Sequence, residues 1–329
     1  MLADWRRTLI LSHVRPDGDA LGAMAALTRA IRADGRQAVP RIFDAVPHRY
    51  RFLVESMGLE SRPGGPAEPA GGFDGLLIVD TCSWAQLEPA AELLRSSGLP
   101  RIVVDHHATR DDVSCGAPCC ALIDPAASSA CLLVFEWLTA CSARIDPGGA
   151  EALLAGMASD TGWFRYPGVD ARTLSAAARL LDLGVRPDVL HARLYASFRA
   201  ARLRLTALAL STLELQAGGR LAVMSLTQEM FRQAGAEPGD SEDLVNEPLS
   251  AGGVVASVML VEQPDGRVRV NFRSKSPEVA GCDIDVAAVA RGFGGGGHRR
   301  AAGATLDGPL DSARKIVAAA TLAAMGQHA

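Results

Sequence analysis

The sequence has few lysines, no even set of cysteines and no long apolar run, and each shortage excludes a class of protein. Lysine occurs only at Lys275 and Lys315, so nearly all of the positive charge is arginine. The formal net charge of −4 disfavours proteins that coat long nucleic acid, because such proteins carry a basic excess. No apolar run is long enough to cross a bilayer, and the one near the N-terminus is too short for a signal peptide. We therefore expect a cytoplasmic protein with no membrane segment.

The cysteines give no sign of a disulfide framework. Seven cysteines are an odd number in a chain of 329 residues, which suits a reducing compartment. Cys115, Cys119 and Cys120 lie near one another, but no second Cys/His pair follows at the spacing of a structural zinc site. We expect these three side chains to be ordinary thiols.

The first half of the chain alternates apolar runs with stretches that favour helices. This alternation predicts a parallel sheet with helices on both faces. The expected strands are 8–12, 37–43, 75–80 and 101–105, with Pro40 indicating an edge or a bulge in the second. The expected helices are 20–35, 85–97, 128–143, 148–159 and 171–184, and a Pro/Gly loop is expected over 62–72.

The pattern changes in the second half. One long helix is expected over 187–215, and Gly218 and Gly219 end it. Strands are expected over 221–226, 254–262 and 267–275, with a hairpin turn at 264–266, and short helices over 227–234, 283–291 and 309–325. The prediction is an α/β protein with a first domain over 1–186, a helical linker over 187–217 and a smaller α/β domain over 218–329.

Side chains that can bind metal ions follow three of the expected strands in the first domain. They are His13, Asp17, Asp19, Asp80, Asp105, His106 and His107. The carboxyl ends of parallel strands meet at one edge of a sheet, so these groups should converge there, and Asp160 at a helix end is a further candidate. Carboxylates crowded in this way need cations, and mixed His/Asp ligands without thiolate suit Mn, Mg or Zn ions. A central carboxylate could bridge two ions, as in many phosphoryl-transfer sites.

Each of these signals is weak alone. A single histidine after a strand is usually a loop residue, and Asp80 taken by itself is better explained as the N-cap of the next helix. The joint pattern is stronger, because three strand ends of one predicted sheet all carry ligand-type side chains.

A run of four glycines over 294–297 precedes His298 near the end of the chain. Glycines let a ligand approach backbone N–H groups and tolerate positive φ, so this loop could form an anion-binding nest. The alternative is a flexible linker, but His298 and the AAGA segment that follows favour a fixed loop. Arg273 could bind phosphate through its guanidinium or could be a plain surface arginine on a strand.

The motifs resemble those of the DHH phosphoesterase superfamily. The matching segments are SHVRPDGDALG (12–22), IVDT (78–81), VDHH (104–107) and SDTG (159–162). The second half resembles the DHHA1 domain through NFRSK (271–275) and GFGGGGHRRAAGA (292–304). Together they cover nearly the whole chain, and the pattern is most similar to the NrnA group of bifunctional oligoribonucleases and pAp phosphatases.

The resemblance implies a role for each ligand-type residue. A first metal would be held by His13, Asp17 and Asp80, and a second by Asp19, Asp80, His106 and Asp160. Asp80 would then bridge the two ions. His107 would face the substrate phosphate as a catalytic group. Asp105 would not bind a metal itself but would orient a histidine.

The resemblance also implies a substrate and a reaction. Arg273, Gly295, Gly296, Gly297 and His298 would bind the substrate. With two divalent ions, Mn²⁺ first and Mg²⁺ as the alternative, the protein would degrade very short RNA to mononucleotides and convert pAp to AMP. Hydrolysis of cyclic di-AMP or pApA is the alternative activity, and a non-catalytic nucleotide-binding regulator is the alternative from another class.

The sequence departs from the family's pattern at two places. The segment Gln86-Leu87-Glu88 replaces an Arg-Leu-Gly that is frequent in relatives, and Arg110 replaces a frequent Asn; both bear on substrate preference, and neither is a proposed ligand. Relatives are often homodimers, and the apolar helices expected over 171–184 and 187–215 could form such an interface or belong to the core.

Overall fold

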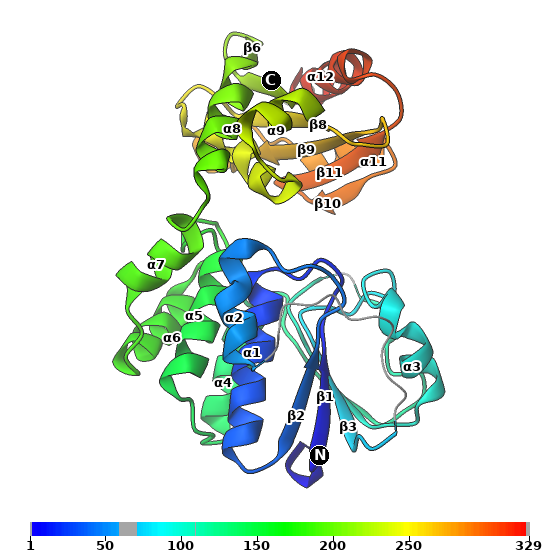
Figure 1. Ribbon diagram of the computed structural model, residues 1–329, viewed down its shortest axis with the longest axis vertical. Helices are drawn as coiled ribbons and strands as arrows, with labels where there is room; N and C mark the ends of the chain where they lie inside the picture. The colour runs from blue at the N-terminus through cyan, green and yellow to red at the C-terminus, as the bar shows by residue number, and fades with distance from the viewer. Residues whose placement is uncertain (1, 59–70, 109, 327–329) are drawn as a thin grey trace. The chain divides into compact units, whose positions relative to one another are not determined.

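The computed structural model describes residues 2–58, 71–108 and 110–326 and divides into two compact units (Figure 1). The first unit is Met1–Ser197 and the second is Phe198–Ala329. The division lies within the expected linker 187–217, whose bounds stay a prediction. Most of the loop expected over 62–72 lies outside the described residues. Within them, no helix combines the length and the apolar character of a membrane span.

The sheet of the first unit has five strands, all parallel, in the order β2-β1-β3-β4-β5. The strands are β1 Arg7–Leu11, β2 Gln37–Arg41, β3 Gly75–Val79, β4 Arg101–Asp105 and β5 Cys119–Ile123. The predicted parallel sheet is confirmed, and Pro40 lies on an edge strand as expected. β5 was not predicted, because it is an edge strand whose side chains are mostly exposed and form no buried apolar run.

Helices cover both faces of this sheet, as predicted (Figure 1). Alternate residues of β1 point to opposite sides: Ile10 packs into the core with α1, α4 and α5, and Leu9 and Leu11 pack toward η3 and α3. The α-helices of this unit are α1 Gly18–Ala33, α2 Arg51–Ser56, α3 Ala91–Ser96, α4 Ala130–Ala140, α5 Pro147–Asp160, α6 Ala171–Asp182 and α7 Pro187–Tyr195. The 3₁₀ helices are η1 Leu2–Asp4, η2 His48–Tyr50 and η3 Glu88–Ala90. The helix expected over 85–97 is therefore a 3₁₀ turn followed by a short α-helix.

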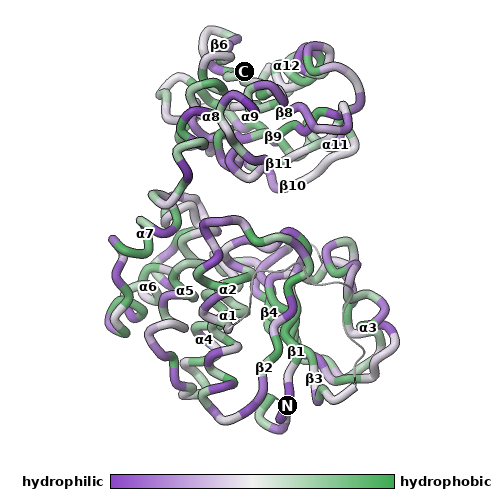
Figure 2. Tube along the Cα trace, viewed as in Figure 1, coloured by the Kyte–Doolittle hydropathy of each residue, from purple (hydrophilic) through white to green (hydrophobic). Residues whose placement is uncertain are grey.

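The central strands of this sheet are hydrophobic over most of their length (Figure 2). All five residues of β3 and of β4 are buried, which is the pattern of parallel strands covered on both faces. Polar residues begin only where the strands end, so the charged side chains gather at the carboxyl edge of the sheet. Asp80, the first residue after β3, has a left-handed backbone with φ 60°. Non-glycine residues adopt this conformation uncommonly, and aspartate is among the residue types that tolerate it best.

The second unit is built on a mixed sheet in the order β10-β11-β9-β8-β7-β6. Only the β7–β8 pair is parallel. The strands are β6 Glu214–Gln216, β7 Leu221–Leu226, β8 Ala256–Glu262, β9 Val268–Ser274, β10 Gly296–His298 and β11 Ala301–Leu306. The helices are α8 Ala200–Ser211, α9 Gln228–Ala234, η4 Pro238–Ser241, η5 Leu244–Ser250, α10 Pro277–Ala280, α11 Val286–Arg291 and α12 Leu310–Gly326. The predicted β8–β9 hairpin is confirmed, and the N–H of Gln263 donates to the carbonyl of Arg267 at 2.8 Å across its turn.

The single helix predicted over 187–215 is wrong. It is two helices, α7 and α8, separated at 196–199, where Arg199 has an extended backbone. Leu190 and Leu194 of α7 belong to the core of the first unit, and Leu205 and Ala209 of α8 belong to a core of the second. The stretch favours helix throughout, so local propensity contains no stop signal. Packing into two separate cores decides where the chain leaves the helix.

Candidate functional site

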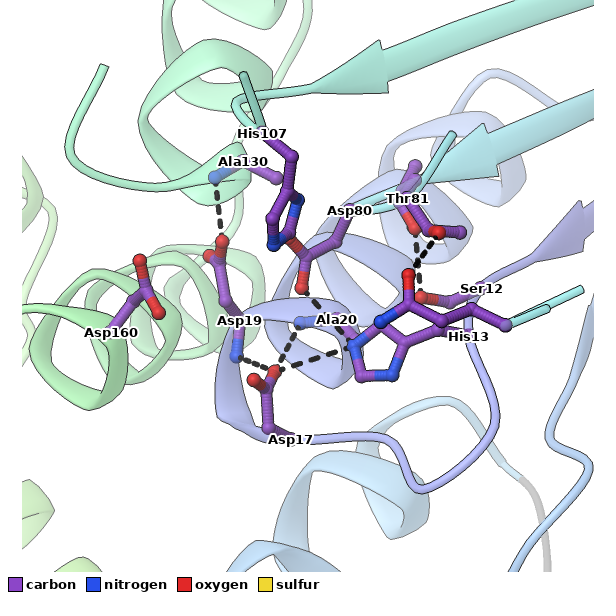
Figure 3. A network of polar contacts seen from close by, with 12 residues as sticks. Ser12, His13, Asp17, Asp19, Ala20, Asp80, Thr81, His107, Ala130 and Asp160 are labelled. Atoms are coloured by element: carbon purple, nitrogen blue, oxygen red, sulfur yellow. Dashed lines mark hydrogen bonds and ion pairs between the residues drawn. The ribbon is translucent and has the colours of Figure 1, made fainter. Parts of the chain in front are cut away.

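The ligand-type side chains of the first unit lie near one another at the carboxyl edge of the sheet (Figure 3). Three groups have ligand atoms within 4.8 Å of one another: His13 with Asp17 and Asp80, Asp19 with His106 and Asp160, and Asp80 with His106 and His107. The six residues that the sequence analysis assigned to metal binding therefore all fall into these groups.

His13 presents one ring nitrogen to two carboxylates. Its Nε2 lies 3.4 Å from Asp80 Oδ2 and 3.9 Å from Asp17 Oδ1. Its Nδ1 lies 2.8 Å from the carbonyl oxygen of Val14, to which it can only donate. This hydrogen bond leaves Nε2 as the ligand atom, which is the usual way a metal-binding histidine is oriented. Asp17 also caps α1, because its Oδ1 accepts from the N–H groups of Asp19 and Ala20.

His106 is oriented in the same way toward the second group. Its Nε2 lies 3.5 Å from Asp80 Oδ1, 3.5 Å from Asp160 Oδ2 and 3.9 Å from Asp19 Oδ2. Its Nδ1 lies 3.3 Å from the carbonyl oxygen of Ala127. One imidazole nitrogen thus faces three carboxylates that come from α1, the end of β3 and the end of α5.

Asp19 is fixed by the start of α4. Its Oδ2 accepts from the N–H of Ala130 at 2.6 Å, and its Oδ1 accepts from the N–H of Cys131 at 2.9 Å. The helix N-terminus stabilises a negative charge at this point. The carboxylate is 1% exposed, so it is held rigidly while its remaining lone pairs face His106.

Asp80 is shared by the two halves of the cluster. Its carboxylate faces His13 through Oδ2 and His106 through Oδ1. The residue is 2% exposed, yet Oδ1 accepts no hydrogen bond from any described residue. A buried carboxylate oxygen without a donor is costly unless a cation satisfies it. The donor set and this unmet oxygen fit divalent metal ions.

The pKa values of the clustered side chains show how strongly the carboxylates favour positive charge or protonation nearby. Burial opposes protonation of both histidines, but Asp80 and the other carboxylates outweigh it and raise the pKa of His13 to about 9 and of His106 to about 10. Burial and the neighbouring carboxylates raise the pKa of Asp160 to about 7 and that of Asp19 well above its usual value. Protons thus occupy positions that metal ions would take, since metal binding displaces protons from its ligands.

His107 is held by Asp105. The His107 Nδ1 lies 2.7 Å from Asp105 Oδ1, which also accepts from the N–H groups of His106 and His107. This hydrogen bond raises the pKa of His107 despite its partial burial. Asp105 is fully buried, so it can orient the ring but cannot meet a substrate. The grouping of His107 with Asp80 and His106 means that distance alone does not separate a catalytic role from a ligand role.

The structure adds polar contacts that the sequence analysis missed. The hydroxyl groups of Tyr50 and Ser159 lie 2.7 Å apart beside the start of α1, where a Cβ on Gly18 would meet Ser159 at 2.5 Å. The Thr81 hydroxyl donates to Gln86 Oε1 at 2.6 Å, so the unusual Gln86 braces the loop that carries Asp80. No sequence signal could have revealed the first contact, since its partners are 109 positions apart.

Two predicted substrate-binding residues of the second unit lie in one row across three strands. His298 of β10 pairs with Ala301 of β11, and Ala301 pairs with Arg273 of β9. Paired residues of adjacent strands project from the same face of a sheet. The small side chain of Ala301 therefore separates His298 from Arg273 on a shared face.

The glycine run is not wholly a loop, which corrects one expectation. Gly296 and Gly297 begin β10 and pair with Gly303 and Ala302 of β11. Gly297 has φ 136°, and a Cβ there would lie 2.6 Å from the carbonyl oxygen of Ala301. A Cβ on Gly295 would lie 2.2 Å from the carbonyl oxygen of Gly303. Glycine is needed because the backbones of β10 and β11 approach too closely for side chains.

Both halves of the chain match known protein families. A family model described as "DHH family, N-terminal domain" matches residues 7–157, and one described as "DHHA1 domain" matches residues 218–324. The "Bifunctional oligoribonuclease and PAP phosphatase NrnA" of Thermus thermophilus is 33% identical over 315 residues, 94% of this chain and 87% of that protein. The "Cyclic-di-AMP phosphodiesterase GdpP" of Geobacillus thermodenitrificans is 26% identical over 93% of this chain but only 45% of that protein.

A solved structure supports the same architecture. An exopolyphosphatase-related protein from Bacteroides fragilis has a TM-score of 0.84 against this chain at 24% sequence identity. The match covers 99% of this chain and 94% of the other. At this identity the similarity establishes the fold only.

Proposed function

The chain belongs to the DHH family, and from this premise we propose that it is a metal-dependent hydrolase that degrades very short RNA to mononucleotides and converts pAp to AMP. The observation that carries the proposal is the pair of ligand groups that meet at Asp80, whose buried Oδ1 has no hydrogen-bond donor among the described residues. The similarity to the Thermus thermophilus protein over most of both chains supports the choice of substrate.

We assign the metal ligands as two sets with one member in common. His13, Asp17 and Asp80 would hold one ion, and Asp19, Asp80, His106 and Asp160 would hold the other. Imidazole and carboxylate ligands without thiolate suit Mn, Mg or Zn ions, and we propose Mn²⁺ first, with Mg²⁺ as the alternative. When bound, such ions supply Lewis acidity and allow hydroxide to form near neutral pH.

The remaining chemistry belongs to side chains of this chain. The hydrogen bond from His107 Nδ1 to Asp105 leaves Nε2 as the atom that can meet a substrate. We assign His107 to the phosphoryl or leaving oxygen, where a ring whose pKa is raised by its hydrogen bond to Asp105 would stabilise negative charge or donate a proton. Asp105 acts through His107 and is a positioning residue.

The substrate-binding residues are assigned to the second unit. Arg273 offers a guanidinium suited to a phosphate, and His298 lies in the same row of the sheet. The backbone of Gly295, Gly296 and Gly297 carries no side chain that could block a ligand. We propose that these five residues bind the nucleotide.

A substrate panel tests the proposal. We would measure kcat/KM of the Mn²⁺-loaded protein with pAp, pApA, cyclic di-AMP and RNA of two to about twenty-four nucleotides. Preference for the shortest RNAs together with pAp turnover is the expected result. Absence of hydrolysis of both, in protein shown to be folded and metal-loaded, would overturn the proposal.

Cyclic di-AMP or pApA hydrolysis is the second candidate function. The similarity to the cyclic-di-AMP phosphodiesterase of Geobacillus thermodenitrificans favours it, although the match spans less than half of that protein. In the same panel, a kcat/KM at least tenfold higher for these dinucleotides than for short RNA would replace the first proposal with this one. The same samples, run with Mg²⁺, give the metal preference, and sedimentation tests whether the chain is a homodimer.

A further inference from the structure

One face of the second sheet is covered by helices over only part of its width. Met224 of β7 and Met259 of β8 project from this face into a core that includes Leu205 of α8 and Phe231 of α9. The residue that pairs with Met259 is Asn271 of β9, which lies outside that core and is half-buried. Helix η5, whose Leu244 and Val245 belong to the same core, lies beside both β8 and β9. Helix coverage of this face is therefore incomplete from β9 onward.

The part of this face formed by β9 and β11, where coverage is incomplete, forms a strip that we call the open strip. It consists of Arg269, Asn271 and Arg273 of β9 and their partners Thr305, Gly303 and Ala301 of β11. All six project from one face, since side chains alternate along each strand and paired residues share a face. The intervening Val270 and Phe272 are fully buried against the helices of the other face.

The open strip is basic in a protein whose net charge is −4. It carries two arginines and an asparagine but no carboxylate. Arg269 is exposed, and no ion pair or hydrogen bond of its side chain is found within residues 2–58, 71–108 and 110–326. By contrast, Arg267, just before β9, is paired with Asp265 at 2.7 Å. Arg269 is thus available to an anion from outside the chain.

The dimensions of the open strip suit a single nucleic acid strand. At about 3.3 Å per residue, Arg269 and Arg273 are separated by roughly 13 Å along β9. In an extended strand, phosphates two nucleotides apart, rather than adjacent ones, can span this separation. Across the strip, Ala301 and Gly303 of β11 carry no long side chain, so a sugar–phosphate backbone can approach the sheet between β9 and β10. The amide of Asn271, between the arginines, can donate to or accept from a base or a sugar.

We propose that the open strip binds the backbone of a short RNA, with Arg269 contacting a phosphate that a mononucleotide does not possess. Arg273 contacts the phosphate common to both kinds of substrate. Arg269 is then the residue that favours an oligonucleotide over pAp. This inference rests on the proposed function and adds the group that selects substrate length.

The test compares two substrates in the metal-loaded, full-length protein. We would measure kcat/KM for pAp and for 5′-phosphorylated triadenylate in the wild type, Arg269→Gln, Arg269→Lys and the matched control Arg267→Gln. Loss of one charge-assisted phosphate contact should lower kcat/KM for triadenylate about tenfold in Arg269→Gln, mainly through KM. Activity toward pAp should stay within twofold, Arg269→Lys should retain most of the activity, and Arg267→Gln should behave as the wild type.

The salt dependence separates a phosphate contact from a structural effect. For single strands, each lost contact reduces the slope of log binding constant against log salt by about 0.7. We expect this reduction for triadenylate bound to Arg269→Gln, measured by fluorescence anisotropy, and no change for Arg267→Gln. A structural defect would lower the melting temperature and affect both substrates equally.

The outcomes distinguish the inference from the function it rests on. Equal loss for pAp and triadenylate, or no loss for either, overturns the role of Arg269 while wild-type hydrolysis still supports the proposed function. A wild type that hydrolyses neither substrate overturns the proposed function. Even then, the binding measurement would decide whether the open strip holds short RNA.

Discussion

The two units use charged residues in opposite ways. The first unit buries its charges: Asp19, Asp80 and Asp105 are each at most 2% exposed, and backbone N–H groups or neighbouring side chains hold them. The second unit displays charges on an incompletely covered face of a sheet, where Arg269 is exposed and Arg273 is half-buried. Bond cleavage needs fixed groups in a site with little water, whereas binding of a flexible strand needs groups that it can reach.

The two sheets bring functional groups together by different routes. In the parallel sheet, loops at the carboxyl edge meet because all strands run the same way, so residues far apart in sequence converge on Asp80. In the antiparallel part of the second sheet, residues are aligned by register, as in the row from His298 to Arg273. Loss of one side chain should therefore affect the whole cluster around Asp80, while substitutions in the second unit should have graded effects.

The largest effect is expected for Asp80→Ala. Removal of the carboxylate shared by both groups should release both ions and lower kcat/KM at least about 10³-fold, because metal catalysis supplies several kcal/mol. Metal content by mass spectrometry and kcat/KM measure the change. The control is Asp188→Ala, which alters an exposed ion pair with Arg186 and should leave both quantities unchanged. A folded Asp80→Ala protein that keeps two ions and full activity would contradict the assignment.

Metal removal should distinguish the two units by their stability. Without ions, the crowded carboxylates of the first unit lose their counter-charges, so this unit should be destabilised by about 3 kcal/mol relative to saturating metal. Hydrogen exchange with and without chelator should then show faster exchange in α1, α4 and α5, and no change in β8 and β9. Equal effects in both units would mean that the ions bind elsewhere.

A smaller effect is expected for Gly297→Ala in the second unit. The new Cβ would require a strained backbone at φ 136° and would approach the carbonyl of Ala301, a strain of roughly 1–3 kcal/mol. Pairing of β10 with β11 should loosen, and KM should rise about tenfold while metal content stays constant. Gly239→Ala is the control, because a Cβ there meets no atom within 4 Å. Unchanged KM would remove β10 from substrate binding.

The smallest effect is expected for Asp283→Asn. Arg299 and Arg300 both pair with Asp283, and their hydrogen bonds lower its pKa to about 2. These pairs are exposed and screened by solvent, so their loss should shift the melting temperature by no more than about 2 °C and KM by no more than about twofold. A larger rise in KM would show that Asp283 positions the arginines for substrate.

The cluster of ligand-type side chains was largely predictable from the sequence. His13, Asp80 and His106 follow buried strands that periodicity and apolar runs reveal, and parallel strands bring such ends together. The sequence shows directly that the glycine run has no side chains, but it does not predict that part of the run pairs as strand β10. That pairing depends on contact with β11, which follows it in the chain and gives no local signal.

Local sequence alone determined which residue types end the strands of the first unit and therefore the kind of chemistry available there. Tertiary structure alone decided that the chain leaves the helix between α7 and α8, that Tyr50 meets Ser159, and that helix coverage of the second sheet is incomplete from β9 onward. The physical reason is the sequence distance over which each interaction acts. Hydrophobic periodicity and propensity act over one or two turns or a single strand, whereas register and coverage are set by packing between segments far apart in the sequence.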